Sequence, residues 1–276
     1  MLYVIDGDGL LYRAAFAVPH FTNDAGMPTN ALHGFAAMLR VLLRTHAPTH
    51  AAVAFTADPP LRRHALDPRY KINHYEHPDE IKVQLPYAMR LVTALGLHPF
   101  LEPGYEADDI IATLLHRHRR LPARILSNDR DFYQLVSDRV HLLVPVRGVS
   151  ELAEIAPADV AARFGVRPEQ VPDLKALVGD PSDDIPGVHG IGVKTAAGLL
   201  RSHATVEDLL AALDTLAPAA RRRIEPMRDR ILLNKRLALL EPVRLKTAAA
   251  NLRITAPHAA RLTRLARDTG VRSIAP

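Results

Sequence analysis

The sequence predicts an α/β fold in which a central, mainly parallel sheet is flanked by helices and followed by a helical C-terminal part. Three short apolar runs, at residues 2–5, 51–55 and 124–126, have the length and composition of buried strands. Apolar residues recur at helical spacing between them, most clearly over residues 31–45 and 109–118. Strands that alternate with helices indicate a parallel sheet covered on both faces.

The second half of the chain has a different pattern. From residue 173 onward we expect only helices, separated by Pro and Gly at residues 181, 186–187 and 190–192. We therefore expect an α/β body over residues 1–172 and a helical part over residues 173–276.

Composition narrows the class of protein. The 276 residues carry a net charge of +5, which weakly favours a polyanionic partner. Cysteine is absent, so disulfides and thiolate metal sites are excluded. No apolar run reaches the roughly 18 residues that span a bilayer, and the first residues do not form a signal peptide. We expect a cytoplasmic protein with no membrane partner.

The carboxylates fall into tight groups. A basic protein that collects carboxylates has to offset their mutual repulsion, and bound divalent cations are the usual means. Taken singly, each group could also be an acidic helix N-terminus or an acidic turn. The groups are Glu106, Asp108 and Asp109; Asp129 and Asp131; and Asp180, Asp183 and Asp184.

Position and residue type favour the metal interpretation. Asp6 and Asp129 lie just past two predicted strands, where ligands bind in parallel sheets, and Thr56 follows the third. Ligands that are all oxygen suit Mg²⁺ or Mn²⁺ rather than zinc or copper. Two such cations roughly 3.5–4 Å apart would clamp a phosphodiester and activate water.

A glycine hairpin follows the last acidic group. Gly190 and Gly192 allow close approach of the backbone, and Lys194 and Thr195 open the next helix, whose free amides can bind a phosphate. This pattern predicts a grip on nucleic-acid backbone that does not depend on sequence. A plain turn between packed helices is the alternative.

These motifs, in this order, resemble the 5′ nuclease (flap endonuclease-like) family. The likeness is greatest to the 5′–3′ exonuclease domain at the N-terminus of bacterial repair DNA polymerases, and it covers residues 1 to about 245. No polymerase domain follows, so a stand-alone member is expected. The matching segments are Val-Ile-Asp6-Gly, Leu-Leu-Tyr12-Arg13-Ala, Tyr70-Lys71, Gly104-Tyr-Glu-Ala-Asp-Asp109, Gln134-Leu-Val-Ser-Asp138 and Lys175-Ala-Leu-Val-Gly-Asp180.

The resemblance implies two metal sites. Asp6, Glu106 and Asp108 would serve the first site. The ligands of the second site would be Asp129, Asp131, Asp180 and Asp183, with Asp109 between the two sites.

The resemblance also implies residues that contact the nucleic acid. Arg13 and Lys71 would stabilise charge at the scissile phosphate, or else are surface cations. Tyr70 would stack on an unpaired base, or else belongs to the core. Lys175 would contact nucleic acid. A helix–three-turn–helix over about residues 174–200 would hold duplex, with a K⁺ ion at the hairpin, and residues 73–95 would form a helical arch.

The chain departs from the family pattern at the first metal site. Thr56 stands where the family has a metal-ligating aspartate, and a hydroxyl is a poor Mg²⁺ ligand. Asp58 could compensate. His74 replaces a usual arginine near the arch, which is itself not strongly basic.

The implied function is that of a monomeric, structure-specific 5′ nuclease acting in replication or repair in the bacterial cytoplasm, in association with the nucleoid. It would hydrolyse DNA at 5′ ends, overhangs, nicks or flap junctions, or act on RNA–DNA primers, by two-metal catalysis. A DNA-binding relative with weak or lost catalysis is one alternative. The other is a phosphatase of the haloacid-dehalogenase type, because Asp6-Gly-Asp8 has the required spacing, but this leaves the hairpin unexplained.

Overall fold

The computed structural model describes residues 1–72, 78–240, 242–245 and 251–276. Its centre is a six-stranded sheet in the order β3-β2-β1-β4-β5-β6, parallel throughout except for the antiparallel pair β5 and β6. The predicted fold class is confirmed. The strands are β1 (Leu2–Asp6), β2 (His50–Phe55), β3 (His98–Leu101), β4 (Ala123–Leu126), β5 (Val140–Arg147) and β6 (Glu151–Ile155).

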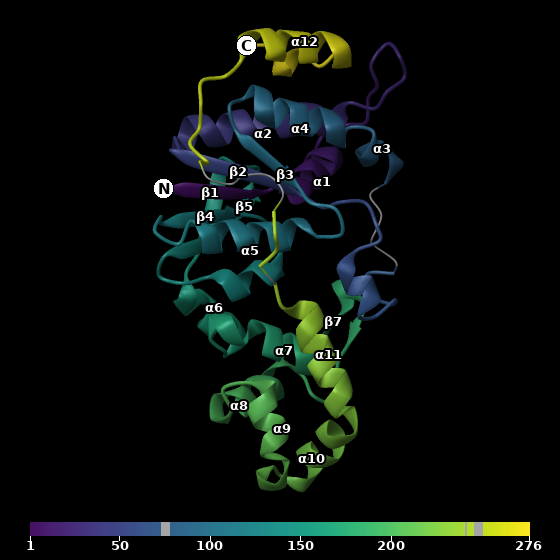
Figure 1. Cartoon of the computed structure of the whole chain (residues 1–276), viewed down its shortest axis with the longest axis vertical. Helices are drawn as coiled ribbons and strands as arrows, with labels where there is room; N and C mark the ends of the chain where they lie inside the picture. The colour runs from purple at the N-terminus through teal and green to yellow at the C-terminus, as the bar shows by residue number, and fades with distance from the viewer. Residues whose placement is uncertain (73–77, 241, 246–250) are drawn as a thin grey trace.

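Helices cover both faces of the sheet because its inner strands are apolar on both sides. Leu2 and Val4 pack toward helix α5 (Ala107–Arg117). Tyr3 and Ile5 point to the opposite face, toward the helices above the sheet in Figure 1. Those helices are α1 (Gly7–Ala17), α2 (Asn30–His46) and α4 (Leu85–Ala94).

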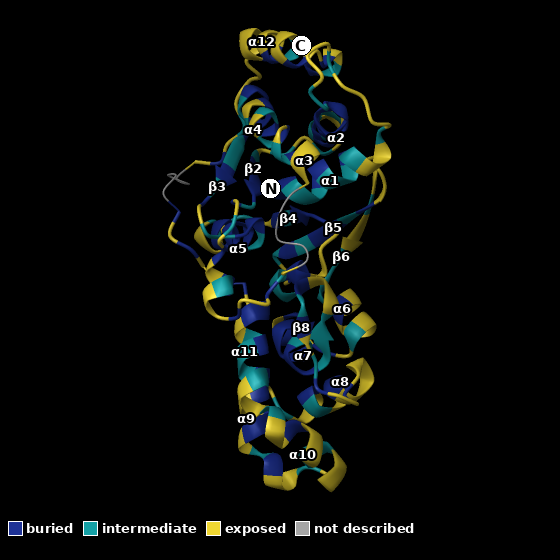
Figure 2. Ribbon diagram, turned by 90° about the vertical axis from the view of Figure 1, so that its right-hand side faces the viewer, coloured by how far each residue is buried: buried dark blue, intermediate teal, exposed yellow. Residues whose placement is uncertain are grey.

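The helical part forms the other end of an elongated molecule (Figure 1), and its helices carry both buried and exposed residues (Figure 2). A small antiparallel hairpin, β7 (Gly179–Asp180) and β8 (Ile185–Pro186), lies between helices α7 and α8 of this part. Among the described residues, no helix has the length and apolarity needed to cross a bilayer. The α-helices are α6 (Pro157–Phe164), α7 (Val171–Val178), α8 (Val193–Ser202), α9 (Val206–Ala211), α10 (Pro218–Ile224) and α11 (Arg228–Ala238).

Short 3₁₀ helices complete the connections. Two of them, η2 and η4, bear acidic residues. The full set is η1 (Arg62–Ala65), η2 (Arg130–Leu135), η3 (Pro168–Gln170), η4 (Pro181–Asp183), η5 (Leu213–Thr215), η6 (Glu225–Met227) and η7 (Arg272–Ile274).

The C-terminal segment returns to the α/β body. The amide of Ala51 donates to the carbonyl of Leu252 at 2.9 Å, and the amide of Thr255 donates to Gly96 at 3.1 Å. Helix α12 (Ala259–Thr269) then lies over α4 (Figure 1), with Leu262 and Leu265 buried in the core of the body. The prediction that residues 173–276 form one helical part is therefore wrong for residues 251–276.

The predicted arch is also corrected in part. Within residues 73–95, α3 (Asp79–Lys82) is a single turn, and α4 is packed into the body through Ala88, Leu91 and Val92. A helix whose apolar face is buried in this way is a layer of the body rather than a free arch. Residues 73–77, and with them His74, lie outside the described residues.

Candidate metal centre and nucleic-acid interface

Carboxylates gather at the edge of the sheet where the parallel strands end. Asp6 is the last residue of β1, and Ser127 directly follows β4. The Ser127 hydroxyl donates to Asp6 Oδ2 at 2.6 Å and accepts from the amide of Asp129 at 3.0 Å. Ser127, which sequence reasoning missed, thus ties the ends of two neighbouring strands together.

Asp6 is also held by the helix that it begins. As the N-cap of α1 it accepts a hydrogen bond on Oδ1 from the amide of Gly9 at 2.8 Å. A Cβ atom on Gly9 would lie 2.4 Å from Asp6 Oδ2. Glycine at position 9 therefore leaves room for the carboxylate.

Thr56 connects the start of α1 to the start of α5. Its amide donates to Asp8 Oδ2 at 2.7 Å, and its hydroxyl accepts from the amide of Ala107 at 3.1 Å. Asp58, the replacement ligand that the sequence offers, is exposed at the surface.

Arg63 is a buried residue of the site that sequence reasoning missed. It donates to both carboxylate oxygens of Asp109 at 2.7 Å each and to Glu106 Oε2 at 2.6 Å. Its remaining donors reach the carbonyls of Leu237 and Leu239, both at 2.9 Å. Asp109 therefore lies in a buried ion pair with Arg63. The stretch Arg62-Arg63-His64 is basic, as exposed segments commonly are, so the sequence does not indicate that Arg63 is buried.

Lys71 lies between the two acidic groups. Its ammonium contacts Glu106 Oε1 and is 3.5 Å from Asp183 Oδ1. The residue has a left-handed backbone with φ of 48°, and its amide donates to the carbonyl of Asp183 at 3.1 Å. The predicted catalytic lysine is thus placed among the carboxylates.

Tyr70 is buried, and Arg13 lines a cavity at another part of the body. The Tyr70 side chain is only 3% exposed and its hydroxyl donates to Glu106 Oε2 at 3.0 Å, so the ring cannot stack on a base and the core alternative holds. Arg13 lines a cavity with Phe16 and Gly148, and none of the predicted metal ligands lines that cavity.

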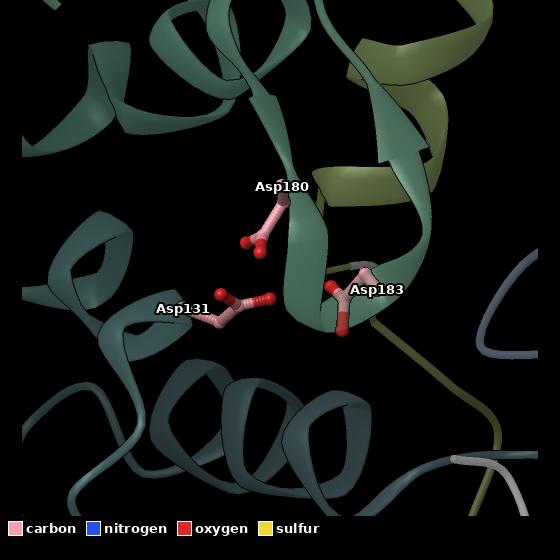
Figure 3. A group of neighbouring side chains, drawn as sticks. All are labelled: Asp131, Asp180 and Asp183. Carbon is pink, nitrogen blue, oxygen red and sulfur yellow. The ribbon is translucent and has the colours of Figure 1, made fainter. Parts of the chain in front are cut away.

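The second acidic group is compact. Asp131, Asp180 and Asp183 each offer a carboxylate oxygen within 4.8 Å of the others. Figure 3 shows Asp131 and Asp180 pointing toward each other, with Asp183 on the turn after β7. Lys175 contacts Asp131 and lies 2.5 Å from Asp180 Oδ2, so its ammonium faces these carboxylates.

A cavity of about 630 Å³ opens beside both groups. Residues from the sheet edge and from α7 line it, including Asp6, Asp129, Asp131 and Asp180. It is therefore the place where a ligand would meet the carboxylates.

Burial and crowding raise the pKa values of most of these acids. Burial raises the pKa of Asp6 to about 7, and the charge of Asp8 adds to the effect. Burial raises the pKa of Asp8 to about 6. Burial and then the charge of Asp129 hold the pKa of Asp108 well above its ordinary value. Carboxylates that resist ionisation in this way are stabilised in their charged form by a cation.

Glu106 and Asp180 are exceptions. Burial alone would raise the pKa of Asp180, but the charge of Lys175 outweighs burial and lowers it. Burial alone would also raise the pKa of Glu106, but the charges of Lys71 and Arg63 outweigh burial and lower the pKa to about 2. Glu106 is therefore ionised throughout the physiological range, and two side-chain cations hold it in place.

The donor set fits hard divalent cations. All the clustered ligands are carboxylate oxygens, the donors that Mg²⁺ and Mn²⁺ prefer. Asp183 Oδ2 is buried and has no hydrogen-bond partner among the described residues. A buried oxygen of that kind needs a partner, and a cation at the cluster would provide one.

The glycine hairpin presents the N-terminus of α8 to solvent. Gly192 is the N-cap of this helix, and Val193, Lys194 and Thr195 are exposed in its first turn. Gly190 has a φ of 76° and its carbonyl accepts from Arg223 at 3.0 Å. An exposed helix N-terminus with a lysine beside it has the features of a phosphate-binding site.

Comparison with known proteins agrees with the geometry. Residues 1–165 match the family described as 5′-3′ exonuclease, N-terminal resolvase-like domain, and residues 166–260 match its C-terminal SAM fold. DNA polymerase I of Bacillus caldotenax is 40% identical over 242 residues, which are 87% of this chain. The chain spans 28% of the length of that polymerase.

Solved structures share the fold. T5 5′-exonuclease with bound zinc superposes with a TM-score of 0.72 at 22% identity, covering 86% of this chain and 88% of that one. Bacteriophage T5 flap endonuclease in complex with DNA and metal ions gives a TM-score of 0.68 at 20% identity, covering 99% and 96%. The two family matches together extend from residue 1 to residue 260, and they show that the chain belongs to the 5′-3′ exonuclease family rather than to the phosphatases.

Proposed function

We propose that this protein is a structure-specific 5′ nuclease that hydrolyses DNA phosphodiesters near 5′ ends or flap junctions. The observation that supports this most is that one cavity is lined by carboxylates from separate elements, namely Asp6 at the end of β1, Asp129 and Asp131 at the start of η2, and Asp180 in β7. The exposed hairpin and α8 N-terminus belong to the adjoining helical part and would hold duplex backbone.

Two groups of carboxylates would hold two divalent cations, Mg²⁺ or Mn²⁺. The proposed first group is Asp6, Glu106 and Asp108, and the second is Asp129, Asp131, Asp180 and Asp183. Bound there, the cations would clamp the phosphodiester, activate water and stabilise the leaving oxygen.

The chain's own cations would do the remaining work. Lys71 is ion-paired to Glu106 and near Asp183, so it can donate to a phosphate oxygen bound between the two groups. Lys175 compensates the charge of Asp131 and Asp180 and would move aside when a divalent cation binds. Arg63 fixes the orientation of Glu106.

Substrate selection would follow shape. Duplex on the hairpin, with a K⁺ ion at the glycine turn, would place an unpaired 5′ strand at the carboxylates. The substrates that we propose are DNA with a 5′ flap, a 5′ overhang or a nick, and RNA–DNA primers. Primer removal or repair in the bacterial nucleoid is the role that we propose for a monomer.

The decisive experiment is cleavage of an end-labelled 5′-flap duplex in Mg²⁺ and separately in Mn²⁺. Wild type is compared with Asp129→Asn and with Asp58→Asn, a matched change of an exposed carboxylate. Cleavage near the junction that only Asp129→Asn abolishes supports the nuclease. Equal cleavage by all three proteins would contradict it.

A second candidate is a DNA-binding relative with weak or lost catalysis. Thr56 favours it, because its hydroxyl is hydrogen-bonded to the amide of Ala107 and adds no negative charge to the site. In that case wild type binds the flap duplex but leaves it uncut in both metals.

A further inference from the structure

Asp8 is the one carboxylate of the Asp6-Gly-Asp8 motif to which the proposed function gives no role. It lies in the first turn of α1, two residues after Asp6, and is partly buried at the edge of the sheet. Its Oδ2 accepts from the amide of Thr56 at 2.7 Å, so the side chain is turned from α1 toward the end of β2.

The contacts of Thr56 bring Asp8 to the N-terminus of α5. The Thr56 hydroxyl accepts from the amide of Ala107, which lies between Glu106 and Asp108 in the chain. The Asp8 carboxylate is also close enough to Glu106, Lys71 and Asp6 to interact with their charges. It therefore lies beside the first acidic group and, like Asp6, comes from the junction of β1 and α1.

We propose that Asp8 supplies to the first cation site the negative charge that Thr56, at the end of β2, does not. This inference rests on the proposed function. The carboxylate comes from the first turn of α1, and its hydrogen bond from the amide of Thr56 holds it at the end of β2, next to position 56. The site would then hold Asp6, Asp8, Glu106 and Asp108.

The alternative is a purely structural role. An acidic residue in the first turn of α1 complements the helix dipole, and Asp8 could simply secure the Thr56 amide. Replacement by asparagine separates the two roles. Asp8→Asn keeps an oxygen acceptor for the amide and removes only the charge.

The test is Mn²⁺ binding to the whole chain without DNA, measured by titration calorimetry and by the loss of the free-ion paramagnetic resonance signal. Five proteins are compared: wild type, Asp8→Asn, Thr56→Asp, Asp8→Asn with Thr56→Asp, and Asp58→Asn as the matched exposed control. We expect Asp8→Asn to lower the affinity for one of the two Mn²⁺ ions by roughly 10–100-fold, a loss typical of disturbed metal sites. The affinity for the other ion should not change. Adding Thr56→Asp should restore the lost affinity.

Two results would overturn the proposal. One is wild-type affinity for both ions in Asp8→Asn. The other is an equal loss of both ions together with a lowered melting temperature of the metal-free protein, as expected for a structural role. Thr56→Asp alone should not tighten Mn²⁺ binding, because the carboxylate is already supplied.

The readout is independent of cleavage. If wild type fails to cut any flap duplex but Asp8→Asn still loses one ion, the proposed function fails and the role of Asp8 stands. If wild type cuts the flap duplex, and Asp8→Asn binds Mn²⁺ and cuts the duplex as well as wild type does, the proposed function stands and the role of Asp8 fails.

Discussion

Arg63 and Asp109 form a buried, two-pronged ion pair in which both carboxylate oxygens accept a hydrogen bond of 2.7 Å. Arg63 comes from η1 and Asp109 from α5, and the same guanidinium reaches the carbonyls of Leu237 and Leu239 beyond the sheet. One side chain therefore joins the acidic site of the body to the end of α11.

We expect Arg63→Ala to lower the free energy of unfolding by about 3–5 kcal/mol, because it leaves Asp109 and Glu106 buried without their partner. Urea unfolding followed by circular dichroism measures this loss. The neighbouring Arg62 is exposed, so Arg62→Ala should cost less than about 1 kcal/mol. Similar losses in the two variants would show that the pair does not stabilise the fold.

Lys71→Ala should reduce the cleavage rate roughly 10²–10³-fold with a small change in KM, because its ammonium would act on charge that develops at the phosphate. Single-turnover cleavage of the flap duplex separates the two parameters. Arg120→Ala, an exposed cation beyond the far end of α5, serves as the control. A rise in KM at an unchanged rate would assign Lys71 to substrate binding alone.

The stability of the metal-free protein should decrease as the pH rises, because of the buried carboxyl group of Asp6. Burial raises its pKa from 3.8 to about 7, so the metal-free folded protein holds a proton that the unfolded chain has already lost above pH 4. Stability from this group is complete below about pH 4 and is lost as pH rises through 7.

The melting temperature of metal-free protein should therefore fall between pH 5 and pH 8, and Mn²⁺ should raise it more at pH 8 than at pH 5. Scanning calorimetry with and without chelator measures both effects. The Asp6→Asn variant should flatten the pH dependence. An equal Mn²⁺ effect at the two pH values would argue against Asp6 as a ligand.

Lys194→Ala should weaken binding to duplex DNA, since one phosphate contact is lost. The slope of log K against log salt concentration should become shallower by about one. Fluorescence anisotropy across a salt series gives both numbers. Arg201 lies exposed in the last turn of the same helix, so Arg201→Ala should leave the slope unchanged. Equal salt-dependence slopes for both variants and wild type would show that α8 does not contact the DNA backbone.

Sequence patterns found the strands that are apolar on both faces and missed the others. Residues 2–5, 51–55 and 124–126 correspond to β1, β2 and β4, which lie inside the sheet. The edge strand β3 contains His98 and Pro99, and the antiparallel β6 is largely exposed, so neither shows a continuous apolar run. Edge strands need fewer apolar residues, which weakens their pattern.

The acidic residues could be predicted from the sequence because clustered carboxylates are chemically unusual. Their partners could not. Arg63 lies in a basic stretch, and its burial depends on carbonyls more than 170 positions away. The burial of Tyr70 and the inward direction of Lys175 likewise depend on tertiary packing.

The return of residues 251–276 to the body makes the helical part an insertion in the chain path of the body. Strand β2 and helix α4 receive their outer neighbours, Leu252 and α12, only after α6 to α11 have been made. During synthesis from the N-terminus, the packing of the body can therefore be completed only when the end of the chain has been made. If translation stalled within the helical part, the nascent α/β body would expose the apolar surface that residues 251–276 cover.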